Sequence, residues 1–193
     1  MNTRLQSTRR PNHLGNGLPG RRQAGLTLIE LLIALGVAAM ATGSVLPGFI
    51  QATQARHIEG VAAQLETDIQ HVRSLSVSQH HTVRMGFSTG AGASCYVVHT
   101  GPAGACNCRP QGEAVCQGNA TALRTVGFTD RAPVQLASNV ASMVFDPIKG
   151  TNTPTATLRV QGRDGRAVHL VVNIMGRVRS CSPSGRMSGY AAC

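Results

Sequence analysis

The six cysteines are the residues of this 193-residue sequence with the widest choice of chemistry. Thiolates can hold zinc in a tetrahedral site, whereas an even number of cysteines in an exported domain usually forms disulfides. In an exported domain we expect a Cys181–Cys193 disulfide closing a small terminal loop. The other four are grouped in one short stretch, and their pairing stays open: Cys95, Cys106, Cys108 and Cys116.

No catalytic motif accompanies these cysteines. The sequence holds no GxSxG, HExxH or P-loop and no catalytic pair of carboxylates. Residues 15–20 match GxGxxG formally, but they follow no strand and open no helix. His80 and His81 fit the end of a helix better than a metal site, and His169 alternates outward on an apolar strand. We therefore expect no enzyme activity, no cofactor and no metal.

One apolar segment decides the compartment. From Leu26 to Leu46 the only charged residue is Glu30, and this length is close to the ~20 residues that a membrane-spanning helix needs. Five arginines and no acidic residue precede the segment. The positive-inside rule then keeps the N-terminus in the cytoplasm and exports the rest, which favours disulfides.

Three interpretations of this N-terminus compete. A conventional or twin-arginine signal peptide would be cleaved near residues 39–44, with Arg21 and Arg22 as the arginine pair. An uncleaved anchor is the second. Both leave Glu30 unexplained, because an acid inside a bilayer costs roughly 2.5–3.5 kcal/mol near the centre of a helix and usually has a partner.

The third interpretation rests on a resemblance. Gly25-Leu26-Thr27-Leu28-Ile29-Glu30 resembles the leader junction of type IV pilins and pseudopilins. The resemblance implies that prepilin peptidase cuts between Gly25 and Leu26, that Leu26 is N-methylated, and that Glu30 pairs with a neighbouring subunit during assembly. Pro47 lies where helices of this family commonly carry a proline.

The periodicity predicts an α+β chain, and the resemblance implies that this chain has the type IV pilin fold. An apolar stripe at spacings of three and four, from Ile58 to Leu75, predicts an amphipathic continuation of the stem helix to about residue 80. Short strands with turn residues follow, including a tight Gly162–Gly165 hairpin, and predict a mainly antiparallel β-domain. We expect a leader at 1–25, a stem helix at 26–80 with 26–47 transmembrane, and a β-domain at 81–193. The composition excludes a disordered chain and a polytopic membrane protein.

Three further segments resemble minor pilins of the FimT/GspH (type II secretion protein H) family. They are residues 69–74 in the stem, Met143–Pro147 followed by Gly150, and residues 171–179, which end in Gly176-Arg177-Val178-Arg179. In this family the closing G-R-x-R motif has been linked to DNA binding in natural transformation. The resemblance extends that expectation to Arg177 and Arg179.

The charge distribution agrees with this expectation. Of the net +10, the leader carries +5, residues 26–158 hold seven basic and seven acidic residues, and residues 159–193 hold six arginines and one aspartate. We expect DNA contact through Gly176, Arg177, Arg179 and Arg186, with Arg186 held near the other two arginines by the Cys181–Cys193 loop. Because aromatic residues are only 3% of the chain, we expect contact mainly with phosphates and not base stacking.

Three functional hypotheses follow. The first is a minor pilin of a type IV pilus or type II secretion pseudopilus, processed by prepilin peptidase, anchored in the inner membrane with its β-domain in the periplasm, assembled with other pilin subunits and binding DNA. The second is a purely structural pseudopilin for protein secretion. The third is an unrelated exported binding protein with a conventional signal peptide.

Overall fold

The computed structural model describes residues 25, 27–90 and 92–193, without the side chains of residues 43–47. Two compact units meet between Ser44 and Val45. Helix α1 spans Leu28–Gln79, so it begins in the first unit and ends in the second. The leader 1–24 and Leu26 lie outside the described residues.

In the first unit, α1 begins at a side-chain cap. Thr27 Oγ1 accepts a hydrogen bond from the backbone N–H of Glu30 at 3.3 Å, and the pair matches the S/T-x-x-E signature of a helix start. The large aliphatic side chains that follow are 53–79% exposed: Leu28, Ile29, Leu31, Leu32, Ile33, Leu35, Val37 and Met40. Within the described part of the chain, no helix is long and apolar enough to cross a membrane. The crossing expected at residues 26–47 is therefore not confirmed and stays a prediction.

In the second unit, α1 buries the expected apolar stripe. Ile58, Leu65, Ile69 and Val72 are at most 1% exposed and belong to one core cluster with the strands. The helix stops at Gln79 because His80 adopts a positive φ of 52° and the N–H of His81 bonds back to the carbonyl of Ser76. The helix ends at Gln79, close to the end at about residue 80 that the apolar spacing predicted.

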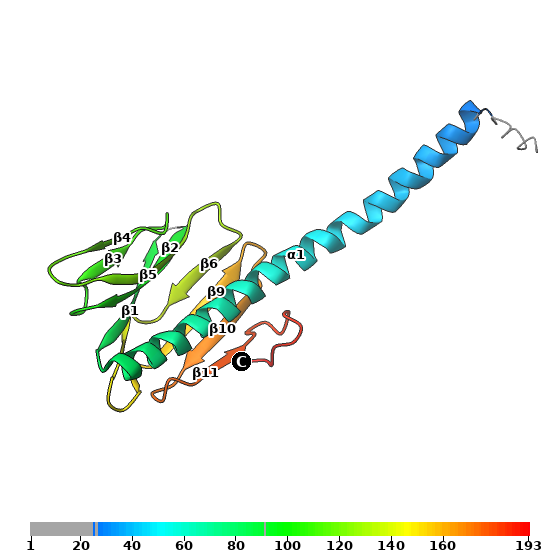
Figure 1. The fold of residues 1–193 in the computed structure, drawn as a ribbon. Coiled ribbons are helices and arrows are strands. Elements are labelled where there is room, and N and C mark those ends of the chain that lie inside the picture. Colours follow the sequence, from blue (N-terminus) through cyan, green and yellow to red (C-terminus); the bar gives the residue numbers. More distant parts are fainter. Residues whose placement is uncertain (1–24, 26, 91) are drawn as a thin grey trace, which may run out of the picture. The chain divides into compact units, whose positions relative to one another are not determined.

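Three antiparallel sheets follow the helix (Figure 1). A five-stranded sheet has the order β5-β2-β1-β7-β8, a four-stranded sheet has the order β11-β10-β9-β6, and β3 pairs with β4. The strands are β1 Val83–Gly90, β2 Ala93–Thr100, β3 Cys106–Cys108, β4 Ala114–Cys116, β5 Ala122–Phe128, β6 Val134–Ser138, β7 Ser142–Phe145, β8 Asn152–Thr153, β9 Ala156–Gly162, β10 Ala167–Val172 and β11 Val178–Cys181. The predicted α+β fold class, a long N-terminal helix followed by mainly antiparallel strands, is therefore confirmed.

The four-stranded sheet has one buried and one exposed face. Leu158, Val160, Leu170 and Val172 are fully buried in the core cluster that contains the helix stripe. The alternate residues of the same strands, among them Arg159, point outward. The β9–β10 hairpin turns at Gly162–Gly165 as expected, and Gly162 has no side chain because a Cβ there would lie 2.8 Å from Ile58 Cδ1 of the helix. This sheet fixes the C-terminal arginines relative to the helix.

Candidate nucleic-acid interface

The G-R-x-R motif begins in the turn between β10 and β11. Asn173 organises this turn: its N–H donates to the carbonyl of Arg177 at 3.1 Å, and its Oδ1 accepts from the N–H groups of Met175 and Arg177 at 3.0 and 2.9 Å. Gly176 has a φ of +71°, a region that residues with a Cβ rarely adopt. The turn thus presents Arg177 from a backbone that Asn173 ties together by three hydrogen bonds within five residues.

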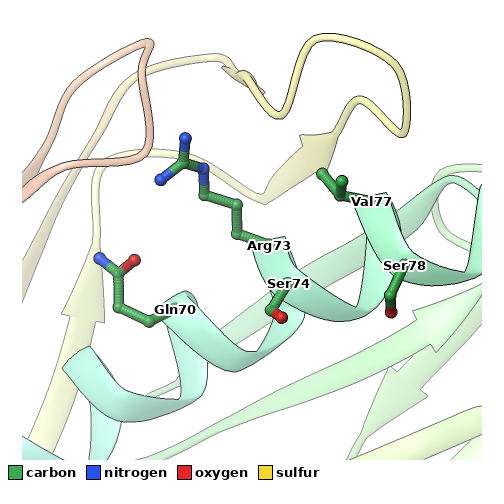
Figure 2. Close-up of a pocket in the computed structure, with 5 residues that line it drawn as sticks. All are labelled: Gln70, Arg73, Ser74, Val77 and Ser78. Atoms are coloured by element: carbon green, nitrogen blue, oxygen red, sulfur yellow. The ribbon is translucent and has the colours of Figure 1, made fainter.

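Two side chains of the stem helix α1 contact this turn and the neighbouring β7–β8 loop. Gln70 Nε2 donates to the carbonyl of Gly176 at 3.1 Å, and Arg73 Nε donates to the carbonyl of Gly150 at 2.8 Å. Figure 2 shows both side chains reaching from α1 toward these loops. A Cβ on Gly176 would lie 2.9 Å from Arg73 Cδ. A side chain at the motif glycine would therefore collide with Arg73, which gives Gly176 a structural reason to be glycine; the DNA contact expected of it stays a prediction.

A substitution at Gly176 tests this role. We expect Gly176→Ala to lower the free energy of unfolding by about 2–3 kcal/mol, because left-handed strain of about 1–2 kcal/mol adds to the collision with Arg73. Gly185→Ala is the matched control, since Gly185 also has a positive φ of 63° but open space around its Cα. Urea unfolding of the full-length chain with intact disulfides measures both. Equal losses in the two variants would contradict the contact with Arg73.

Arg177 and Arg179 are exposed, and their side chains have no hydrogen bond or ion pair with any described residue. Other arginines of the domain are engaged: Arg124 pairs with Asp68, Arg166 pairs with Asp164, and Arg163 donates to the carbonyls of Asp130 and Ala132. The two motif arginines are therefore free to bind an anion.

Arg179 shares the outer face of the four-stranded sheet with Arg159 and His169. Arg179 lies opposite Val171, and Arg159 lies opposite His169 in the neighbouring register of the same face. Arg159 Nε donates to His169 Nε2 at 2.9 Å. Burial, and then the nearby Arg159 guanidinium, lower the pKa of His169, so this histidine is neutral at neutral pH.

The expectation that Arg186 lies near Arg177 and Arg179 is wrong. Arg186 Nη2 lies 3.5 Å from the carbonyl of Gly165, in a surface hollow that also contains Gln51 of α1. Arg177 instead lines a hollow with Arg73 of α1. Gln51 and Arg73 are separated by about 33 Å along the helix axis. Arg186 therefore lies at the opposite end of the domain from Arg177. The terminal loop folds back toward the β9–β10 hairpin and not toward the β10–β11 turn.

All six cysteines form disulfides in the structure. Cys181 is joined to Cys193, as expected, and the open central pairing is Cys95–Cys108 and Cys106–Cys116. Cys106–Cys116 joins β3 to β4, and Cys95–Cys108 joins β3 to β2. Around these bonds lies a small core that contains Cys95, Val97, Cys106 and Cys108. Within the described residues no thiol remains to bind zinc, and no cluster of three metal-ligating side chains is present.

The N-terminal residues implied by the pilin resemblance are only partly described. Gly25 and Glu30 are exposed, and Leu26 lies outside the described residues. Glu30 occupies the first turn of α1, where a carboxylate interacts favourably with the helix dipole. The structure does not test cleavage, methylation or assembly.

Sequence reasoning missed one buried polar group. Asp68 of α1 accepts a hydrogen bond from the Tyr96 hydroxyl at 2.5 Å and forms an ion pair with Arg124 at 2.9 Å. Burial, followed by the hydrogen bond to Asp68, raises the pKa of Tyr96 above its usual range. The signal was an acidic residue inside the apolar stripe, directly before Ile69. The network ties the helix to β2 and β5.

The comparisons with known proteins place the chain in a family. Residues 61–176 match the model of the family described as Type II transport protein GspH, and residues 20–46 match the prokaryotic N-terminal methylation motif. A search of curated proteins found no match.

Two solved structures are similar in part, both of the type IV minor pilin FimU of Pseudomonas aeruginosa. Each is 17% identical with a TM-score of 0.45; the matches cover 63% and 64% of this chain and 86% and 91% of those chains. The match to the family model covers more than half of the chain, which therefore belongs to the GspH family, the minor pilins and pseudopilins of the GspH/FimT type.

Proposed function

We propose that this minor pilin or pseudopilin binds the phosphate backbone of DNA through Arg177 and Arg179, in a pilus that takes up DNA. The observation that carries the proposal is a pair of exposed arginines with no partner among the described residues: Arg177 in a turn that the stem helix contacts, and Arg179 in β11. Arginine suits this role because its planar guanidinium binds phosphate oxygens in a bidentate manner.

The net charge near the motif supports the same ligand. Residues 159–193 carry the whole net positive charge of the chain after the leader. Contact of this kind is electrostatic and independent of base sequence, so affinity falls steeply as salt rises. The test is DNA retention by the double variant Arg177→Gln/Arg179→Gln at several salt concentrations, with a charge-matched double variant elsewhere on the domain.

We also propose that the N-terminus is processed and anchored as in other members of the family. Cleavage after Gly25 creates an ammonium group at Leu26, and Glu30 of a neighbouring subunit is its acidic partner. Residues 26–47 cross the inner membrane, and the β-domain lies in the periplasm. The exposed aliphatic side chains of the first unit support this proposal, since burial in lipid or in a helix bundle removes them from water.

Mass spectrometry of the protein purified from a host with prepilin peptidase tests the processing. We expect an N-terminal peptide that begins at Leu26 with one added methyl group, and the uncut chain in a host without the peptidase. A Gly25→Leu variant serves as the control and should stay uncut, because glycine lacks the side chain that would obstruct the cut. An N-terminus near residues 42–45 would contradict the pilin type of processing and indicate a conventional signal peptide.

A second candidate function has one observation in its favour. The matching family model describes a type II transport protein, which fits a pseudopilin with a purely structural role in protein secretion. The genes adjacent to the gene for this chain distinguish the two functions: secretion genes favour the structural role, and pilus or competence genes favour DNA uptake.

A further inference from the structure

A surface hollow lies between the stem helix and the G-R-x-R turn. Its volume is about 460 Å³, within the range of small-ligand sites. A second hollow of about 390 Å³ shares Gln70 and Arg73 and continues along the helix toward Ser78 (Figure 2). The first is lined by Gln70, Arg73, Asn173, Met175, Gly176 and Arg177. Among the described residues, no carboxylate lines either hollow, so positive charge prevails in both.

Only one nitrogen of the Arg73 guanidinium, Nε, is held by a hydrogen bond to a described residue. Its Nε donates to the carbonyl of Gly150, and its Cδ lies against Gly176. Its two Nη groups have no hydrogen bond or ion pair with any described residue. The end of the guanidinium that suits a bidentate phosphate is therefore free, while the rest of the side chain is already ordered.

The same contacts bring Arg73 next to Arg177. Gly176 touches Arg73 and directly precedes Arg177 in the turn, and Gln70 holds the carbonyl of Gly176. One cation thus comes from the stem helix and one from the motif, about a hundred residues apart in sequence, on the walls of a single hollow. Gln70, whose amide donates to the carbonyl of Gly176, lines the same hollow.

We propose that Arg73 and Arg177 form one anion site that takes a backbone phosphate of DNA, with Arg73 as both a ligand of the phosphate and the positioning residue of the turn. The site rests on the proposed function for its ligand and deepens it, since it adds a stem-helix residue to the DNA-binding surface. The ordering of Arg73 before binding reduces the entropy lost when the phosphate arrives.

Salt titrations of DNA retention by the full-length chain in neutral detergent test the proposal. We expect Arg73→Gln to weaken retention about tenfold at low salt, the loss of one charge-assisted contact, and to reduce the log–log salt slope by about 0.9. Arg73→Lys should keep the slope, because the charge remains. Arg56→Gln is the control, since Arg56 is an exposed arginine on the same helix paired with Glu59; it should change neither quantity.

The slope separates a phosphate ligand from a purely structural residue. If Arg73 only braced the turn, Arg73→Gln and Arg73→Lys would lose affinity alike with an unchanged slope, and that result overturns the proposal. The Arg73 Nε–H NMR signal of the wild-type chain gives a readout that needs no variant to fold. It should shift saturably with inorganic phosphate while the Arg56 signal stays, and an unmoved Arg73 signal also overturns the anion site.

These readouts keep the two proposals apart. If the wild-type chain fails to retain DNA but phosphate moves the Arg73 signal, the DNA function fails and the anion site stands for free phosphate. If DNA is retained and Arg73→Gln behaves like Arg56→Gln, the DNA function stands and the role of Arg73 fails.

Discussion

Replacing Arg177 and Arg179 together with glutamine is expected to weaken the retention of double-stranded DNA about 100-fold at low salt, because each charge-assisted contact contributes about 1.5 kcal/mol. The log–log salt slope should fall by about 1.8, since two phosphate contacts are lost. Both side chains are exposed and have no partner among the described residues, so the free energy of unfolding should change by less than about 0.5 kcal/mol. Fluorescence anisotropy over a salt series measures the binding.

The double variant Arg131→Gln/Arg186→Gln is the matched control. It removes the same charge from two exposed arginines, one in the β5–β6 loop and one in the terminal loop. Arg186 lies beside Gly165 of the β9–β10 hairpin. Arg131 directly follows Asp130, whose carbonyl accepts a hydrogen bond from Arg163 of the same hairpin. Both arginines therefore lie at the end of the sheet away from Arg177. Equal weakening by both double variants would mean that only net charge matters and that the turn is no specific site.

The sequence predicted the elements that have local signals. Apolar spacing gave the helix stripe, and the Gly162–Gly165 turn gave the β9–β10 hairpin, because both signals come from residues close together in the chain. Four strands were not predicted: β3, β4, β8 and β11. The first three have two or three residues, too few for alternation to show, and β3 and β4 depend on disulfides whose pairing the sequence left open.

The candidate site shows the same limit. The motif pointed to Arg177 and Arg179, but nothing local connected them to Arg73, whose contacts with Gly150 and Gly176 span 77 and more residues. Arg186 was placed wrongly because a Cys181–Cys193 bond fixes the length of a loop and not its direction. The β11 strand that precedes the loop runs away from the G-R-x-R turn, and the loop follows it. The direction of the terminal loop follows from the antiparallel pairing of β11 with β10, and the spacing of the cysteines carries no information about that pairing.

Removing the buried carboxylate of α1 is expected to have the largest effect on stability. We expect Asp68→Ala to lower the free energy of unfolding by about 3 kcal/mol, because the Tyr96 hydroxyl loses its acceptor in a place where water cannot replace it. Tyr96 is 1% exposed, whereas the Arg124 side chain is 47% exposed and regains part of its hydration. Glu66→Ala, one half-turn away on the same helix, is the control and should cost less than about 0.5 kcal/mol. Similar losses in both variants would contradict the network.

The pH dependence of stability checks the same network from the tyrosine side. Because the folded-state pKa of Tyr96 is raised, its contribution is complete below the unfolded pKa of about 10 and is lost as the pH rises above it. Burial also raises the pKa of Tyr190, so wild type must be compared with Tyr96→Phe, which keeps that second tyrosine. The unfolding free energy of wild type should fall more steeply with alkaline pH than that of Tyr96→Phe. Parallel curves would mean that folding does not raise the pKa of Tyr96, and would contradict the buried hydrogen bond between its hydroxyl and Asp68.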